Sequence, residues 1–197
     1  MAPSTNSSDE KRDSILRAVI PVFGRLGFRK ATVEDLAGAA GLSKQGLYLH
    51  FSGKEDVFVA AMQRYLEDGL HFVDEALATA DAPLLDRLVD AMDAWFGRHL
   101  EAFTPPSLDV IEAADRSNSA IDGYKTAFKA RIETALMQSD EFAATENICT
   151  PGELSEVLFR FGLTWKEVRQ SRADFRCKVR LCVRACCQLN TSAQDAE

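Results

Sequence analysis

Residues 32–54, TVEDLAGAAGLSKQGLYLHFSGK, constrain the fold more than any other stretch, because two short helical patterns follow one another with almost no linker. Thr32 has the side chain of an N-cap, and Asp35, three residues later, completes the pattern of a capping box. Gly41 ends the first helix, because glycine adopts the left-handed conformation at little cost. Ser43 caps a second helix, so the sequence predicts a helix-turn-helix.

The second helix of this pair has two different faces. Leu47 and Phe51 are four residues apart, so both are expected to face the core. The other side chains suit a surface that reads base edges in a DNA groove better than a solvated surface. They are Lys44, Gln45, Tyr48 and His50.

The order of residues in this stretch resembles the signature of TetR-family transcriptional regulators. The resemblance rests on Gly41-Leu42-Ser43, then Leu47-Tyr48-Leu49-His50-Phe51, then Lys54-Glu55. It is close over about residues 10–60 and beyond them extends only to size and helical character. Gly46 stands where threonine or alanine is more common, and Leu49 where an aromatic or polar residue is. Both departures concern which DNA sequence is read rather than the fold.

The pattern assigns roles in DNA binding. Lys44 and Gln45, near the N-terminus of the second helix, are predicted to contact base edges in the major groove. Tyr48, His50 and Lys54 are predicted to hold the phosphate backbone, with Lys54 at a helix N-terminus whose amides favour phosphate. The alternative is a solvated helical hairpin in a protein with another task. Since one unit contacts few base pairs, the DNA partner is expected to be a double-stranded palindromic operator bound by a homodimer.

The first predicted helix runs from about Asp9 to Leu26, bends at Pro21 and ends at Gly27. Thr32, at the start of the next helix, is predicted to donate to a phosphate. Basic residues near the start of the first helix either touch the phosphate backbone or are ordinary solvated charges. They are Lys11, Arg12 and Arg17.

The net charge of −7 opposes DNA binding if it is taken over the whole chain. It is unevenly distributed: residues 61–163 carry 19 acidic and 8 basic residues, whereas residues 1–60 carry 7 and 8. The acidity therefore lies away from the predicted DNA-binding stretch. No run of 18 apolar residues and no secretory signal is present, so we expect a cytoplasmic protein with reduced thiols and no membrane partner.

Every strong periodicity in the chain is helical, so the fold is predicted to be all-α. A polar connection is expected over residues 140–150. The predicted domains are a disordered tail (1–8), a helix-turn-helix DNA-binding domain (9–55), an effector-binding and dimerisation domain (56–190) and a second tail (191–197). Beyond the first three helices, we predict helices over 54–79, 84–102, a short one to 114, 120–137, 151–168 and 171–189, the last beginning with a Ser171–Asp174 capping box.

Aromatic and amphipathic side chains of the middle helices are predicted to line a small-molecule effector pocket, although each fits a plain core equally well. They are Trp95, Phe96, His99, Phe103, Tyr124 and Phe128.

The last two helices are the predicted dimer surface, because the resemblance implies that they pair with their copies. The apolar residues assigned to it are Leu154, Val157, Leu158, Phe161, Phe175, Val179, Cys182, Val183 and Cys186. A second stripe, at four-residue spacing, either meets the acidic middle segment or is solvated. It consists of Arg176, Arg180 and Arg184.

Four of the five cysteines crowd the last helix: Cys177, Cys182, Cys186 and Cys187, with Cys149 elsewhere. Small buried cysteines suit close helix packing. Alternatively, Cys182 and Cys186 share a face and bind a metal or respond to oxidation, with nearby arginines lowering the thiol pKa.

No phosphate-binding loop, nucleophile motif or metal-ligand spacing is found, so neither an enzyme nor a cofactor is predicted. The function predicted is a DNA-binding regulator, a repressor released from its operator by a small molecule. A thiol- or metal-responsive regulator and a helical binding adaptor without DNA binding are the alternatives.

Overall fold

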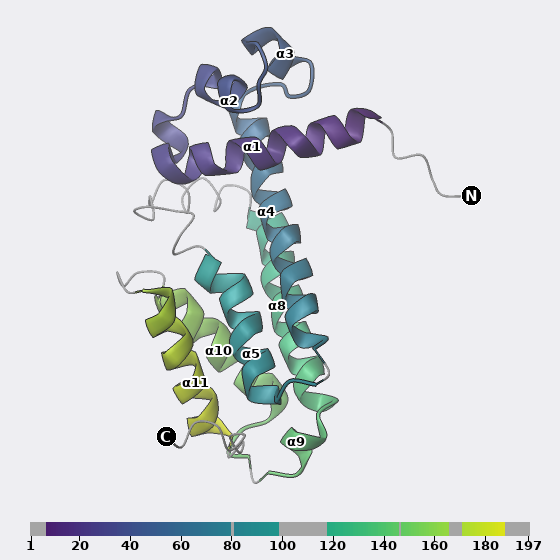
Figure 1. The fold of residues 1–197 in the computed structure, drawn as a ribbon, viewed down its shortest axis with the longest axis vertical. Helices are drawn as coiled ribbons and strands as arrows, with labels where there is room; N and C mark the ends of the chain where they lie inside the picture. The colour runs from purple at the N-terminus through teal and green to yellow at the C-terminus, as the bar shows by residue number, and fades with distance from the viewer. Residues whose placement is uncertain (1–6, 80, 99–117, 146, 166–170, 188–197) are drawn as a thin grey trace, which may run out of the picture. The chain divides into compact units, whose positions relative to one another are not determined.

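The computed structural model describes residues 7–79, 81–98, 118–145, 147–165 and 171–187, and the elements within them are helical, which confirms the all-α class. Figure 1 shows them in chain order. They are α1 (Ser7–Lys30), α2 (Val33–Ala39), α3 (Lys44–Tyr48), α4 (Lys54–Leu77), α5 (Leu84–Met92), the π-helix η1 (Asp93–Gly97), α8 (Asn118–Met137), α9 (Asp140–Ala143), α10 (Pro151–Trp165) and α11 (Arg172–Cys186). None of these helices has both the length and the apolar composition of a transmembrane span.

The chain divides into two compact units within α4. The first contains α1, α2, α3 and α4 as far as Asp68. The second begins at Gly69 and contains α5, η1, α9, α10, α11 and α8 from Gly123 onward. The predicted DNA-binding segment, 9–55, lies inside the first unit, which extends further into α4. The four domain boundaries themselves stay predictions.

Phenylalanines form part of the core of the first unit. Phe23 meets Phe58 edge to face with ring centroids 5.1 Å apart, and Phe28 meets Phe58 at 5.0 Å. Gly27, which directly precedes Phe28, has a φ of 74°, which glycine adopts with little strain. The predicted break at Gly27 is confirmed. Pro21 lies inside α1, and the bend predicted there stays a prediction.

Aromatic side chains from η1 and α8 form the core of the second unit. Trp95 stacks on Phe128 with centroids 5.1 Å apart, and Phe96 meets Phe128 edge-on at 5.6 Å. Gly162 of α10 lies against this cluster, because a Cβ atom there would come within 2.3 Å of the Phe96 ring. The close approach of α10 therefore depends on glycine at this position.

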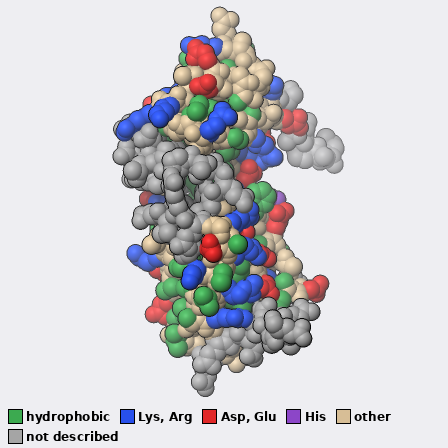
Figure 2. Space-filling view, turned by 60° about the vertical axis from the view of Figure 1, so that its left-hand side comes forward, with side chains coloured by type: hydrophobic (Ala, Val, Ile, Leu, Met, Phe, Trp, Pro, Cys, Tyr) green, Lys and Arg blue, Asp and Glu red, His purple; other side chains and the backbone are tan. Residues whose placement is uncertain are grey.

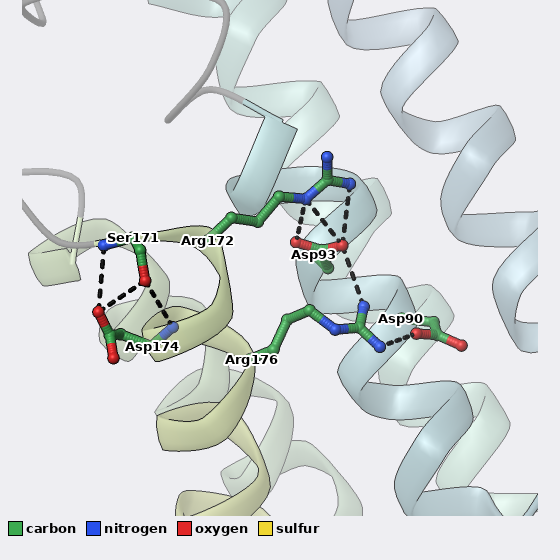
Figure 3. A network of polar contacts seen from close by, with 6 residues as sticks. All are labelled: Asp90, Asp93, Ser171, Arg172, Asp174 and Arg176. Atoms are coloured by element: carbon green, nitrogen blue, oxygen red, sulfur yellow. Dashed lines mark hydrogen bonds and ion pairs between the residues drawn. The ribbon is translucent and has the colours of Figure 1, made fainter.

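A buried aspartate joins η1 to α11 (Figure 3). The side chain of Asp93 is 8% exposed, and its carboxylate accepts from Arg172 Nε at 2.9 Å and Arg172 Nη2 at 2.9 Å. Arg176 donates to the same carboxylate at 3.0 Å and to Asp90 at 2.6 Å. Gly97 leaves room for the Asp93 carboxylate, because a Cβ there would overlap it.

Two features of α11 agree with predictions from the sequence: its capping box and its arginine stripe. The hydroxyl of Ser171 accepts from the Asp174 amide at 3.1 Å, which confirms the capping box. Arg180 pairs with Asp86 of α5 at 2.6 Å, so Arg176 and Arg180 meet the acidic middle segment within one chain. The π-helix η1 and the short α9 are not predicted by the periodicity, which shows one continuous helix and a polar connection there.

Candidate nucleic-acid interface

The predicted caps hold the helix-turn-helix of the first unit. The Thr32 hydroxyl accepts from the Asp35 amide at 3.1 Å, and the Asp35 carboxylate accepts from the Thr32 amide at 2.9 Å. Gly41 has a φ of 65°, as expected for a glycine that ends a helix. The Ser43 hydroxyl accepts from the Gly46 amide at 3.0 Å and starts α3. These contacts confirm the capping predicted for both helices.

The two faces of α3 are also confirmed. Leu47 is 1% exposed and Phe51 is 2% exposed, and both belong to the core of the first unit. Lys44, Gln45 and Tyr48 are exposed. The helix therefore presents a lysine, a glutamine and a tyrosine outward, held in place by its buried side.

Lys44 is not a free cation on this surface. Its ammonium lies 2.7 Å from the carboxylate of Glu34 on α2, and both side chains are at least half exposed. The hydrogen bond to Glu34 raises the pKa of Lys44, and the same bond lowers the pKa of Glu34. Lys44 therefore exchanges one anionic partner for another if it contacts DNA.

The hydroxyl proton of Thr32 is already engaged. Thr32 Oγ1 lies 2.6 Å from Asp35 Oδ2, and this hydrogen bond holds the pKa of Asp35 below its usual value. A phosphate contact through this hydroxyl requires the proton to leave the capping box. The predicted role of Thr32 stays a prediction.

Lys54 makes its contacts inside the first unit. Its ammonium donates to the carbonyl oxygens of Phe28 at 2.9 Å, Ala31 at 3.1 Å and Arg29 at 3.5 Å. It also lies 4.6 Å from the centroid of the Phe28 ring. A cation among the carbonyls that end α1 is electrostatically favourable. Lys54 thus ties the start of α4 to the end of α1.

Arg12 performs a similar task at the end of α3, which the sequence does not indicate. Its guanidinium donates to the carbonyl oxygen of His50 at 2.6 Å and lies 4.2 Å from the centroid of the Phe51 ring. Arg17, another candidate for phosphate contact, pairs with Asp13 at 3.0 Å. His50 is half-buried, and its predicted contact with DNA stays untested.

Four of the six predicted effector residues lie within the described part of the chain. Trp95, Phe96 and Phe128 are packed in the core, and Tyr124 is half-buried. The other two, His99 and Phe103, lie outside the described residues. A groove of about 370 Å³ is instead lined by residues of α4, α5 and α8, by Ala78, which follows α4, and by Gln138, which follows α8. The lining residues are Asp74, Leu77, Ala78, Arg87, Ala130, Arg131, Thr134, Ala135 and Gln138.

Much of the predicted dimer stripe is packed within its own chain. The buried members are Leu154, Leu158, Phe175, Val179 and Val183. Val157 is 42% exposed, while Phe161, Cys182 and Cys186 are half-buried. Other apolar side chains are exposed on the same two helices, namely Leu163 of α10 and Leu181 of α11. Figure 2 shows hydrophobic side chains among Lys and Arg on the surface of the second unit.

Four of the cysteines, Cys149, Cys182, Cys186 and Cys187, lie near the end of α11, whereas Cys177 is exposed nearer its start. Cys149 Sγ lies 3.8 Å from the carbonyl oxygen of Cys186. Burial, together with neighbouring thiols, raises the pKa of Cys182 to about 11 and that of Cys187 to about 12. Within the described residues, no group of three His, Cys, Asp or Glu side chains is arranged to hold a metal ion.

The sequence matches known regulators over its N-terminal part. Residues 15–61 match the model of the bacterial regulatory proteins of the tetR family. The chain is 36% identical over 88 residues, 45% of its length, to the transcriptional activator FasR of Mycolicibacterium smegmatis. It is 30% identical over 128 residues, 65% of its length, to the transcriptional repressor KstR2 of Rhodococcus jostii. The matches span 40% and 55% of those two relatives.

Comparison of folds extends the likeness to nearly the whole chain. The reduced form of NemR from Escherichia coli superimposes with a TM-score of 0.72, at 17% sequence identity. The match covers 93% of this chain and 100% of that structure. At this identity the likeness concerns the fold alone. Residues 15–61 therefore resemble the N-terminal domain of the tetR family of bacterial regulatory proteins, and the chain shares its fold with a solved structure over nearly its whole length.

Proposed function

We propose that the protein is a transcriptional regulator that binds a palindromic operator as a homodimer. The observation that carries this proposal is the outward face of α3, where Lys44, Gln45 and Tyr48 are exposed while Leu47 and Phe51 are buried. An α-helix fits the major groove of B-DNA, where lysine and glutamine side chains distinguish bases by their hydrogen-bonding groups. The names of FasR and KstR2 support the same function.

Of the six predicted DNA contacts, the exposed ones on α3 are best placed. Gln45 and Tyr48 are exposed on α3, and Lys44 becomes available once its pair with Glu34 opens. Lys54 acts instead as a positioning residue, because its ammonium is surrounded by the carbonyls of α1. The phosphate contacts therefore come from other residues, with Tyr48, Thr32 and His50 as the remaining predicted ones.

The dimer and the effector complete the proposal. One α3 reads only a few base pairs, so affinity and specificity require two copies on two half-sites. The exposed apolar side chains of α10 and α11 support these helices as the dimer surface. A small molecule bound in the second unit releases DNA only through its different affinity for the bound and free conformations. We place this repressor in the cytoplasm.

The thiol-responsive alternative has less support. The pKa of Cys182 is about 11, so its thiolate is scarce near neutral pH, and a thiolate is the reactive form. The adaptor alternative requires that the protein does not bind DNA, so a DNA-binding assay tests it directly.

A gel-shift assay with DNA flanking the protein's own gene tests the proposal. The expected result is a complex with one segment that survives competition by scrambled DNA of the same composition. Its affinity should fall linearly with the logarithm of salt concentration, because bound phosphates release counterions. Equal affinity for the segment and its scrambled copy contradicts operator recognition, and the absence of a complex with either duplex argues for the adaptor.

A further inference from the structure

Leu49 is the most exposed large hydrophobic side chain among the described residues. It is 85% exposed, against 46% for its neighbour Tyr48. The helical backbone of α3 continues past it, because the amides of His50 and Phe51 both donate to the carbonyl oxygen of Leu47, at 3.0 and 3.1 Å. Leu49 is therefore held on a helical turn.

The turn places Leu49 on the outward side of α3. Gln45, Tyr48 and Leu49 have the spacing i, i+3 and i+4, which puts them on one side of a helix. Leu47 and Phe51, on the other side, are in the core. Leu49 therefore shares the face on which Gln45 is available to read bases.

Single exposed leucines are common on protein surfaces, so exposure alone does not indicate a function for Leu49. Its place beside Gln45 on α3 does. Leucine has no hydrogen-bonding group, and the feature of the major groove that an aliphatic side chain recognises is the C5-methyl group of thymine. We propose that Leu49 is a specificity-determining residue that contacts a thymine methyl in each half-site of the operator. This inference rests on the proposed function.

The position of that thymine follows from the helix. Gln45 and Leu49 are separated by about one turn, or about 5.4 Å along the axis. A base-pair step is about 3.4 Å. If α3 lies along the groove, the thymine is one or two base pairs from the base that Gln45 contacts.

The experiment removes single methyl groups from the DNA. The operator is first selected from random-sequence duplexes by the full-length wild-type protein. Each thymine is then replaced, one at a time, by deoxyuridine, which pairs identically but lacks the methyl group. The wild type is expected to lose about fourfold in affinity at one thymine of each half-site, the value of one buried methyl group.

Two variants decide whether Leu49 causes the loss. Leu49→Ala is expected to bind the thymine and deoxyuridine operators equally at that position, whereas an effect of the base on DNA bending persists in the variant. Ile148→Ala changes an isoleucine of the second unit that is 77% exposed, and it should discriminate like the wild type. Unchanged melting temperatures of both variants check that they fold.

The outcomes separate this inference from the function on which it rests. If the wild type selects an operator but tolerates deoxyuridine at every position, or if Leu49→Ala keeps the discrimination, the inference is overturned and the regulator stands. If the wild type selects no sequence at all, the proposed function fails, and the role of Leu49 fails with it.

Discussion

The ammonium of Lys54 lies 2.9 Å from the carbonyl oxygen of Phe28, at the break that ends the long part of α1. The ammonium also donates to the carbonyl oxygens of Ala31 and Arg29, so three backbone oxygen atoms lie around the positive charge. A lysine that the sequence pattern assigns to phosphate is therefore part of the internal structure of the first unit.

Lys54→Met should separate these two roles. The variant keeps the aliphatic stem but loses the charged hydrogen bonds, so we expect the free energy of unfolding to fall by about 1.5 kcal/mol. Operator affinity falls with the distorted geometry, but the slope of log K against log salt stays as in the wild type. Salt titrations and thermal melts measure both quantities. A shallower slope with unchanged stability indicates a phosphate contact and refutes the positioning role.

The pair of Lys44 and Glu34 predicts a gain of affinity. Glu34→Gln removes an anion next to the proposed DNA-binding face and releases Lys44, so operator binding should strengthen several-fold at low salt and less at high salt. The control is Glu75→Gln in the second unit, which also removes one negative charge from an exposed side chain with a neighbour on the surface, His71 at 3.3 Å. Equal gains in the two variants point to net charge alone.

Two glycines of the helix-turn-helix should respond oppositely to alanine. Gly41 has a φ of 65° and open space around its Cβ position, so Gly41→Ala should cost about 1 kcal/mol of stability through backbone strain alone. Gly38 is exposed within α2 and also has open space, so Gly38→Ala should stabilise by up to about 1 kcal/mol through helix propensity. Chemical denaturation of the two variants measures the difference, and effects of the same sign exclude this explanation.

The ion pairs that join α11 to η1 and to α5 should differ in strength. Asp93→Asn leaves Arg172 and Arg176 without their buried partner, and the expected loss of stability is about 2 kcal/mol, because both arginines still reach solvent. Arg180→Gln breaks the more exposed pair with Asp86 and should cost less than about 1 kcal/mol. Thermal melts compare the losses of stability of the two variants. A larger loss for Arg180→Gln would contradict the stronger role assigned to the buried Asp93.

The thiols at the end of α11 should resist alkylation. The pKa of Cys182 rises from 9.0 to about 11, so its thiolate fraction at pH 8 is about 100-fold lower than that of an ordinary thiol. Iodoacetamide at pH 8 should leave Cys182 and Cys187 unmodified in the native protein and modify them after denaturation. Mass spectrometry of the peptides reads the result. Rapid modification of native Cys182 favours the thiol-responsive regulator instead.

Local chemistry made the helix ends predictable from the sequence. The caps at Thr32, Ser43 and Ser171 each depend on a side chain and an amide three residues apart, so the pattern contains both partners. The two faces of α3 follow in the same way, from the spacing of Leu47 and Phe51. These features needed no knowledge of distant parts of the chain.

Contacts between distant residues were not predictable. Arg12 and Lys54 resemble phosphate ligands in the sequence. Their partners are backbone carbonyls, 38 residues away for Arg12 and up to 26 residues away for Lys54, and no sequence pattern indicates such contacts. The apolar stripe of α11 shows a similar limit. Periodicity indicates that Phe175 and Val179 are buried, but it does not tell whether the same chain or a second copy buries them. In the structure the same chain does.

The most direct test of the DNA-binding face is the affinity of Gln45→Ala/Tyr48→Ala for the selected operator, measured by fluorescence anisotropy beside the wild type. Both residues are exposed, so the melting temperature and the molecular mass in solution should not change. The account predicts a loss of about 100-fold, the combined value of a base contact by Gln45 and a hydrogen bond from Tyr48 to a charged phosphate. An unchanged affinity would contradict the assignment of α3 as the helix that reads DNA.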